Sequence, residues 1–356
     1  MATIGQMYDF DTEIATFFSQ TSVSREECDQ VAKDLVGHSQ VVPVPIQGVC
    51  SYTVYAGEQL EFVVQFRLKS LQLKLETVTL ARQIYGELVP EVSFRTQLGE
   101  DAATAGQEPL LVYVMTRILG PSRLDFIIAD KFPDNSPENK ARRRNLVKDV
   151  ARFFATAWKA PQHVEPAYHD HMAETFNKDL QSLLVALPTR FHPIIRATIK
   201  SLPKILNLPM VLTHGDFFES NIIVDESSYH LAGVIDWAEA EITPFGVNLV
   251  SPQLLMSKLH LRDGYIRYDD YDELTGLFWS TFTSEAGGLS VDTIKTIKAA
   301  RVLGVLRSKG FTARLRNMAT PVPIGDDAIG RYNMMQLDGL LLNPATRFED
   351  MDEYLA

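Results

Sequence analysis

The sequence is poor in the features that mark secreted, zinc-binding and membrane-spanning proteins. It has only two cysteines, Cys28 and Cys50, in 356 residues, and their spacing matches neither a disulfide framework nor a zinc site. No run approaches the ~18 apolar residues that a membrane span needs, and residues 1–6 carry no basic segment that leads into an apolar one. We therefore expect a cytoplasmic protein that does not bind membranes.

Positive charge is also scarce. The chain has 34 lysines and arginines against 45 aspartates and glutamates, and its formal net charge is -11. Binding to a phosphate backbone requires a basic face, so nucleic acid is not expected as a partner. The one dense basic run, residues 140–144 with Lys148, falls on the first turns of a predicted helix, where we interpret it as a solvated face. An acidic balance is compatible with a cationic substrate.

What is present is an ordinary globular composition, with 46% hydrophobic and 22% charged residues. The length suggests one large or two medium domains. Strand-like patterns fill residues 41–67 and recur at 110–115, with a predicted helix at 71–88 between them. Helical patterns dominate the remainder, beginning with a long amphipathic helix after Ser136-Pro137. Further helices are predicted at 11–20, 24–37, 292–316 and 326–342.

The most informative segment is the octapeptide His-Gly-Asp-Phe-Phe-Glu-Ser-Asn at 214–221, which is followed at 235–237 by Ile-Asp-Trp. Two apolar runs and a polar turn at 225–228 separate them, which predicts strand, turn and strand. Such strands return to their starting end, so Asn221 and Asp236 should be neighbours, with Asp216 in the loop before them. Oxygen ligands of this kind suit Mg²⁺ together with substrate phosphates. The segment therefore predicts phosphoryl transfer.

The spacing from Asp216 to Asn221 is also that of the kinase catalytic loop. Together with Gly215, the Gly-Val-Ile-Asp-Trp at 233–237 and Pro244, it resembles the aminoglycoside phosphotransferase family of small-molecule kinases. The resemblance implies that Asp216 is the catalytic base and that His214 braces the loop. It also implies that Asn221 and Asp236 are the metal ligands.

The resemblance further implies an α+β, two-lobed protein-kinase-like fold. A small N-lobe would span residues 1–117, with the N-terminal helices and a nucleotide-binding antiparallel sheet. A larger, mainly helical C-lobe would span 118–356, with the catalytic loop and the substrate site. One departure from the family pattern is Asn248, which stands before Leu249 where the family usually has aspartate. Asparagine can substitute there as a neutral hydrogen-bonding group.

A kinase needs backbone donors and a cation on the phosphates of the nucleotide. The candidate loop contains Gly48, which allows close backbone approach, and Ser51, which adds a hydroxyl. For the cation we favour Arg67, paired with Glu76 of the following helix, and Lys69 is the alternative. Arginine keeps the charge and can bind phosphate through two donors.

By the same resemblance, residues Met115 to Ile118 would form the hinge whose backbone amides recognise adenine. The expected cofactors are ATP and Mg²⁺. The expected partner is a small molecule with a hydroxyl acceptor, which acidic side chains would hold if it is cationic. The candidate acids are Glu219, Glu239, Glu241 and the cluster at 269–273. The oligomeric state is left open.

The predicted activity is that of a small-molecule kinase, an enzyme that moves the γ-phosphoryl group of ATP to an alcohol group. Two alternatives stay open. One is a kinase-shaped binding or scaffold protein without transferase activity, which the unusual Arg67 and the glycine-poor loop at Gly48 would fit. The other is an ATP-using enzyme of a different reaction type. Family likeness does not name the acceptor.

Overall fold

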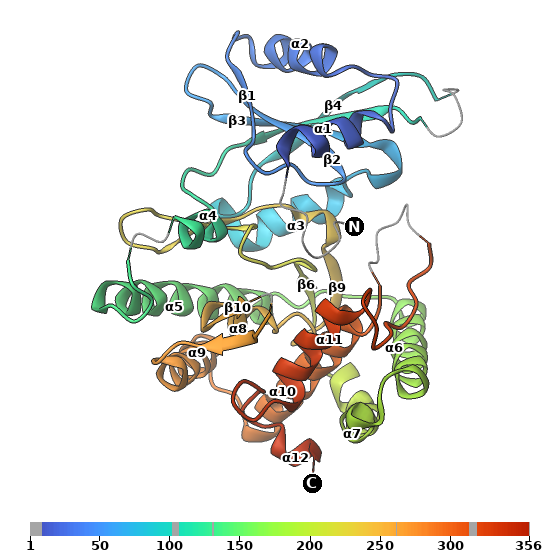
Figure 1. Cartoon of the computed structure of the whole chain (residues 1–356), viewed down its shortest axis with the longest axis vertical. Helices are drawn as coiled ribbons and strands as arrows, with labels where there is room; N and C mark the ends of the chain where they lie inside the picture. The colour runs from blue at the N-terminus through green and yellow to red at the C-terminus, as the bar shows by residue number, and fades with distance from the viewer. Residues whose placement is uncertain (1–8, 102–106, 130–131, 261, 313–318, 356) are drawn as a thin grey trace. The chain divides into compact units, whose positions relative to one another are not determined.

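The computed structural model describes residues 9–101, 107–129, 132–260, 262–312 and 319–355 (Figure 1). Contacts divide the chain into two compact units. The first unit comprises Met1–Leu119 and Gly233–Ala238, and the second comprises Gly120–Ala232 and Glu239–Ala356. The predicted lobe boundary after residue 117 stays a prediction.

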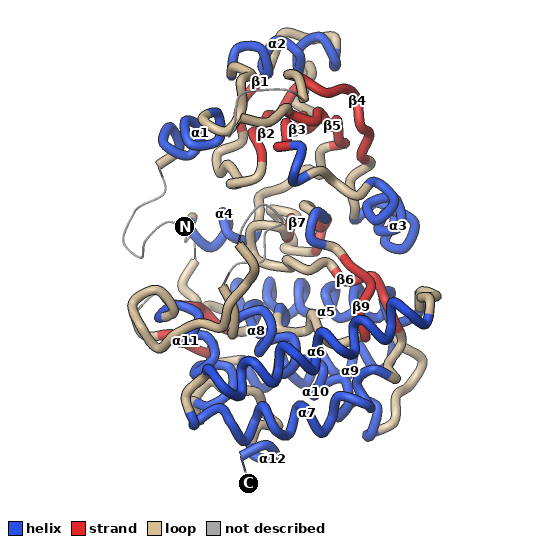
Figure 2. The backbone as a smooth tube through the Cα atoms, turned by 90° about the vertical axis from the view of Figure 1, so that its right-hand side faces the viewer, coloured by secondary structure: helices blue, strands red, loops and turns tan. Residues whose placement is uncertain are grey.

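The first unit is built on a five-stranded antiparallel sheet in the order β1-β2-β3-β5-β4. Its strands are β1 (Val41–Pro43), β2 (Ser51–Ala56), β3 (Phe62–Leu68), β4 (Val92–Leu98) and β5 (Leu110–Thr116). Its helices are α1 (Phe10–Phe18), α2 (Arg25–Val36) and α3 (Leu75–Tyr85), with 3₁₀ turns at Lys69–Leu71 and Gly86–Leu88. Side chains of α1 and α2 pack with β2, β3 and β5 in one hydrophobic core, and Figure 2 shows the strands beside these helices.

The second unit is mainly helical (Figure 1). Its helices are α4 (Arg123–Ile128), α5 (Pro137–Lys159), α6 (Pro166–Ala186), α7 (His192–Leu206), α8 (Ser251–Leu255), α9 (Tyr271–Glu285), α10 (Val291–Lys309), α11 (Arg331–Leu337) and α12 (Asp352–Leu355). Two short antiparallel sheets pair β6 (Met210–Thr213) with β9 (Glu241–Pro244), and β10 (Ser257–His260) with β11 (Gly264–Arg267). β7 (Ile222–Val224) pairs with β8 (Leu231–Val234), of which Leu231 and Ala232 belong to this unit.

Local signals in the sequence explain several boundaries. The hydroxyl of Ser24 accepts from the Glu27 amide at the start of α2, and Gly37 ends this helix with φ 69°. The hydroxyl of Ser136 caps α5, whose first residue is Pro137. The apolar face of α5 is buried as its periodicity predicts, and α5 packs against α9. In the described part of the chain, no helix is long and apolar enough to cross a membrane.

Some predicted boundaries were wrong. The helix expected at 71–88 is an α-helix only over Leu75–Tyr85, and the one expected at 326–342 begins only at Arg331 and ends in a π-helical turn, Asp338–Leu342. The helix expected at 292–316 ends at Lys309, although residues 313–316 lie outside the described part. The strand expected after the polar turn at 225–228 is shorter than expected and is β8, because Tyr229 has a positive φ of 60° and belongs to the turn.

The interpretation of residues 140–144 as a solvated face was wrong for Arg143. Its guanidinium is buried, donates to the Asp270 carboxylate at 2.9 Å and lies 4.1 Å from the centre of the Tyr268 ring. Asp270 occupies the N-cap position of α9 but makes no side-chain cap. A buried ion pair with hydrogen bonds on both partners explains why these two charged residues leave the solvent.

Candidate functional site

The loop 214–221 is fixed at its start by a short sheet in the second unit. Thr213 is the last residue of β6, pairs with Glu241 of β9 and donates from its hydroxyl to the Glu241 carbonyl at 3.0 Å. Gly215 follows with φ 80°, and a Cβ atom there would lie 2.2 Å from the carbonyl oxygen of Glu239. Only glycine fits both the left-handed conformation and this close approach. The need for glycine between His214 and Asp216 is therefore steric.

Asn221 holds Asp216 in place. Its Nδ2 donates to the backbone carbonyl of Asp216 at 2.8 Å and to the Asp216 Oδ2 atom at 3.0 Å. The loop between them is a tight turn, in which the Phe218 amide donates to the Asp216 carbonyl at 3.0 Å and the Asn221 amide to the Phe218 carbonyl at 2.9 Å. Asn221 is buried and Asp216 is partly exposed. The carboxylate is thus oriented by the loop while remaining accessible to solvent.

His214 and Phe217 anchor this loop to the core of the second unit. His214 is 4% exposed, and its Nδ1 atom accepts a hydrogen bond from the Asp216 amide at 3.3 Å. The Phe217 ring is buried 5.2 Å from the Phe153 ring and 5.4 Å from the Phe154 ring, both on α5. These two aromatic rings of α5 therefore pack against the loop.

Two cations that the sequence did not reveal lie beside the loop. Arg123 Nη1 donates to Glu219 at 3.1 Å, and Lys309 Nζ lies 4.8 Å from the centre of the Phe218 ring. Burial lowers the pKa of Lys309, whereas the charges of Asp216 and Glu219 act in the opposite direction. Arg123 and Glu219 are 96 residues apart in the chain, so no spacing pattern links them. The same ion pair neutralises Glu219, which was a candidate for amine binding.

In the first unit, the structure brings Arg67 close to Asp236. Arg67 is 3% exposed, and its guanidinium lies 3.9 Å from Asp236, measured between Nη1 and Oδ1. Arg67 Nε also donates to the Leu71 carbonyl at 2.9 Å, and Nη1 donates to Gln65 Oε1 at 3.2 Å. These contacts turn the guanidinium toward its own strand and the following turn. The buried position fits a fixed cation, which planar arginine provides well.

The predicted pair of Arg67 with Glu76 is not formed among the described residues, and in this respect the prediction was wrong. Glu76 is exposed in the first turn of α3, where its charge complements the helix dipole. The alternative cation, Lys69, pairs with Asp101 at 2.5 Å on the surface. Arg67 is thus the buried cation of this strand.

Asp236 lies in a strained backbone conformation. Its φ is 60°, which is uncommon for a residue other than glycine. Strained backbone conformations of this kind cluster at functional sites. The next residue, Trp237, is buried 5.2 Å from the Tyr85 ring and donates from Nε1 to the Val234 carbonyl at 2.9 Å. The Asp236 side chain is 46% exposed. Asn221 belongs to the other unit, so its predicted proximity to Asp236 stays a prediction.

The loop between β1 and β2 is tied by one glutamine. The Gln47 side chain donates to the carbonyls of Val44 and Thr53 and accepts from the Thr53 amide. The next residue, Gly48, has no atom within 4 Å of the position that a Cβ would take. Ser51 is buried at the start of β2, with its hydroxyl 3.3 Å from that of Thr53. Gly48 therefore has open space beside it, whereas the Ser51 hydroxyl is already engaged.

The predicted hinge follows the central part of the sheet. Met115 lies in β5 between Val63 of β3 and Val92 of β4. Ile118 packs against Gly233, where a Cβ atom would come within 2.3 Å of the Ile118 Cδ1 atom. The structure thus places both residues at the end of β5, in the first unit. Their role in adenine recognition stays a prediction.

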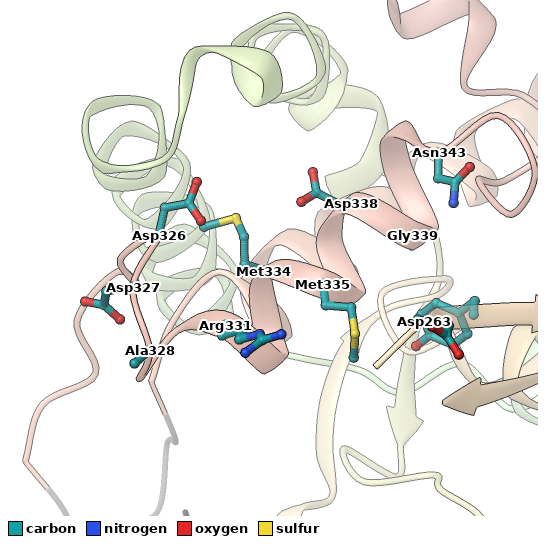
Figure 3. A pocket seen from close by; sticks show the side chains of 12 residues that line it. Asp263, Asp326, Asp327, Ala328, Arg331, Met334, Met335, Asp338, Gly339 and Asn343 are labelled. Atoms are coloured by element: carbon teal, nitrogen blue, oxygen red, sulfur yellow. The ribbon is translucent and has the colours of Figure 1, made fainter. Parts of the chain in front are cut away.

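A cavity of about 630 Å³ lies in the second unit (Figure 3). Figure 3 shows Arg331, Met334 and Met335 on α11, with Asp326 and Asp327 on the preceding loop. Its size is typical of a small-molecule site. No motif in the sequence marks its carboxylates, which are Asp263, Asp326, Asp327 and Asp338. Asp263 lies in the turn between β10 and β11, far in the sequence from the other three, and only the fold brings it to them.

Asn221 and Asp236 present amide and carboxylate oxygens, which are hard donors that fit Mg²⁺. The described residues contain no cluster of three or more His, Cys, Asp or Glu side chains that would form a dedicated metal cage. Magnesium in kinase sites is usually held by one or two protein side chains together with substrate phosphates and waters. The donor set is therefore chemically compatible with that mode of binding.

Comparisons with known proteins bear on the family and the fold of the chain. A model of the APH phosphotransferase enzyme family matches residues 48–276. No curated protein matches the sequence at a significant level. The structure is similar to that of a proposed aminoglycoside phosphotransferase from Ralstonia eutropha JMP134, with 13% identity, a TM-score of 0.50, and coverage of 88% of this chain and 95% of that chain.

Two further solved structures are similar at lower TM-scores. An aminoglycoside-3'-phosphotransferase of type VIII has 14% identity and a TM-score of 0.48, with coverage of 78% of this chain and 97% of that one. The aminoglycoside phosphotransferase APH(3'')-Id from Streptomyces rimosus ATCC10970 has 15% identity and a TM-score of 0.44, with coverage of 76% and 95%.

The predicted family and the predicted two-lobed, kinase-like α+β fold are thereby confirmed. The family model spans more than half of the chain and includes the loop 214–221. This chain belongs to the APH phosphotransferase enzyme family.

Proposed function

We propose that this phosphotransferase moves the γ-phosphoryl group of ATP to a hydroxyl group of a small molecule, with Asp216 as the catalytic base. The observation that carries the proposal is the double hydrogen bond from Asn221 to Asp216. A general base must be held in a fixed position relative to the proton that it accepts. The loop supplies this position through contacts that do not depend on a bound ligand.

The proposed step is simple in chemical terms. The acceptor hydroxyl would give its proton to the Asp216 carboxylate as its oxygen bonds to the γ-phosphorus and the bond to the β-phosphate oxygen breaks. Catalysis of this kind is mostly positioning and electrostatic stabilisation. Lys309, next to Phe218 and attracted by Asp216, would supply a positive charge beside the loop. Asn221 and Asp236 would hold Mg²⁺, which neutralises charge on the phosphates when bound.

The first unit would bind the nucleotide. Open space beside Gly48 suits the close approach of phosphates to backbone amides. Arg67 supplies a buried cation, and its ion pair with Asp236 links the proposed phosphate-binding residue to the proposed metal ligand. Met115 to Ile118 would receive adenine at the end of β5.

A small molecule with amino groups is the acceptor class that we favour. Four carboxylates line the 630 Å³ cavity of the second unit. Tyr265, which also lines it, lies within electrostatic reach of Glu219 in the catalytic loop. Arg190 already pairs with Asp326 and Asp338, so a cationic acceptor would compete with an internal cation.

Turnover of ATP in the presence of a panel of hydroxylated small molecules tests the proposal. The panel should contain amino sugars, amino alcohols and neutral sugars, with phosphorylated products identified by mass spectrometry. Acceptor-dependent formation of ADP and a phosphomonoester is the expected result. ATP consumption with a product that lacks the phosphoryl group would instead indicate a different ATP-using reaction.

A thermal-shift titration with Mg²⁺ and ATP separates the enzyme from a scaffold protein. A ligand at a hundred times its Kd stabilises the folded state by about 2.7 kcal/mol. The proposal predicts a Mg²⁺-dependent rise in Tm with ATP. An unchanged Tm at saturating ATP would favour the scaffold alternative.

A further inference from the structure

A second, smaller cavity in the second unit is lined mainly by cations. It encloses about 40 Å³ between α4, α5, β10 and the turn at Tyr229. The charged residues that line it are Arg123, Arg142, Arg143, Lys258 and Asp134. Four basic side chains and one carboxylate therefore surround the cavity. None of these residues has a part in the phosphoryl-transfer step proposed above.

Three of the four cations have a carboxylate partner. Arg143 pairs with Asp270 at 2.9 Å, Lys258 pairs with Asp134 at 2.5 Å, and Arg123 pairs with Glu219 at 3.1 Å. Arg142 is different, because within the described residues it makes neither an ion pair nor a hydrogen bond. Among the described residues, the lining consequently carries one positive charge that has no carboxylate partner.

Two buried donors lie in this lining without an acceptor. They are the Nε atom of Arg123 and the Nη1 atom of Arg142, and no described protein atom accepts from either. Arg123 is 2% exposed, so its Nε atom cannot turn to bulk solvent. A buried polar group without a partner destabilises a protein by about 1–3 kcal/mol, and by more when it is charged. An acceptor bound in the cavity that these two residues line would give such donors a partner.

Aromatic rings fix the position of Arg142. Its guanidinium lies 4.3 Å from the centre of the Phe132 ring and 5.2 Å from that of the Phe126 ring. The Phe126 ring in turn packs 4.5 Å from the ring of Tyr229. A planar guanidinium held on aromatic faces keeps its donors directed and loses little further freedom when a ligand binds.

We infer that this cavity is a binding site for an oxyanion, a carboxylate or phosphate group, held by Arg142 and Arg123. Guanidinium groups match the geometry of both anions. A cavity needs roughly 10–15 Å³ to hold one water, so about 40 Å³ admits a group of a few atoms and excludes a nucleotide. The site is distinct from the proposed catalytic residues, although Arg123 also contacts Glu219 of the catalytic loop.

Isothermal titration of the full chain with inorganic phosphate, and separately with acetate, tests this inference. The informative variant is Arg142→Gln, which removes the uncompensated charge. Its matched control is Arg144→Gln on the same helix, where the exposed Arg144 pairs with Glu273 instead. We expect at least one of the two anions to bind the wild type and Arg144→Gln with equal Kd. We expect its Kd for Arg142→Gln to be higher by about tenfold or more. Tighter binding of phosphate than of acetate would identify a phosphate group as the natural occupant.

Equal anion affinity in wild type and Arg142→Gln overturns the inference, since the anion would then bind elsewhere, for example at the proposed nucleotide site. Absence of binding by both anions to the wild type also overturns it. If Arg142→Gln does not fold, Arg142→Lys replaces it, because lysine keeps the charge but loses the planar fork. The inference then requires weaker binding by Arg142→Lys than by Arg144→Gln. ATP turnover is measured in parallel, so failure of this site and failure of the proposed catalytic function are distinguishable.

Discussion

At the residue scale, the loop 214–221 is held by contacts that only particular residues can make. Asn221 contacts both the backbone and the carboxylate of Asp216, and Gly215 passes close to the Glu239 carbonyl. The spacing of Asp216 and Asn221 could be read from the sequence because the two residues are five positions apart. The sequence could not show why residue 215 must be glycine. It also could not show that Arg123 and Lys309 lie beside this loop, because each of these features depends on a residue from a distant element.

Gly215→Ala is expected to destabilise the protein by more than the cost of a left-handed φ alone. The new Cβ would meet the Glu239 carbonyl in addition to the backbone strain. Gly287→Ala is the matched control, because Gly287 has a similar φ of 87° and no atom within 4 Å of its Cβ position. In urea unfolding, Gly215→Ala should lose more of the free energy of unfolding than Gly287→Ala does, by at least about 1 kcal/mol. Equal losses for the two variants would contradict the steric argument.

At the element scale, caps and apolar periodicity predicted α2 and α5 well, because both signals are local. The same reasoning overextended the helix after β3 and the last helices of the chain, where 3₁₀ and π turns interrupt the α-helical pattern. It also misread Arg143, since a buried ion pair with Asp270 depends on the packing of α5 against α9. Tertiary contacts override local propensity at these places.

The loop between β1 and β2 offers a test of nucleotide binding that leaves folding unchanged. Gly48→Ala should keep the Tm of the free protein, because no atom lies within 4 Å of the added methyl group and φ is not in the left-handed region. If phosphates approach this backbone, the same methyl group should weaken ATP binding. We expect the Kd to rise by roughly tenfold, which corresponds to a loss of about 1.4 kcal/mol of binding free energy. Titration calorimetry with Mg²⁺ and ATP measures this. Unchanged affinity would exclude close approach at Gly48.

The contact of α10 with the C-terminal segment makes stability depend on pH. Burial raises the pKa of Glu349, but Arg301 and Lys298 outweigh burial and hold it at about 2, below the ordinary value of 4.5. The ionised form is therefore favoured in the folded state, and its stabilisation is complete above pH 4.5 and is lost as the pH falls toward 2. This contribution is at most about 3 kcal/mol at neutral pH.

Glu349→Gln should accordingly lower the free energy of unfolding at pH 7 and flatten its decline between about pH 5 and 2. Glu353→Gln is the control, because Glu353 forms an exposed pair with Lys295, and such pairs contribute little. Chemical denaturation across this pH range measures both variants. Parallel pH profiles for wild type and Glu349→Gln would contradict the assignment.

At the scale of the whole molecule, the proposed reaction requires residues from both units. Asp216 and Asn221 belong to the second unit, whereas Arg67 and Asp236 belong to the first. The sequence motif predicted the family because its residues cluster within a short stretch of the chain, and the family model confirms that prediction. The acceptor could not be predicted, because the carboxylates around the large cavity come from segments that only folding assembles.

Asp236→Ala should weaken the binding of ATP in the presence of Mg²⁺ more than in its absence. The carboxylate is the proposed metal ligand and also the ion-pair partner of Arg67. Asp236→Asn is the control for the backbone, since asparagine tolerates a positive φ better than most residues and keeps one oxygen donor. Titrations with and without Mg²⁺ separate the two effects. An equal loss under both conditions would contradict metal binding at Asp236.

The most direct test is the turnover of ATP by Asp216→Ala, with an acceptor that the wild type phosphorylates, measured together with the Kd for ATP. Removal of a general base typically costs 10²–10⁴-fold in rate. The account predicts a fall in kcat of about this size, while the Kd for ATP stays within about twofold of the wild type. A variant that retains the full wild-type rate would contradict the assignment of Asp216 as the catalytic base.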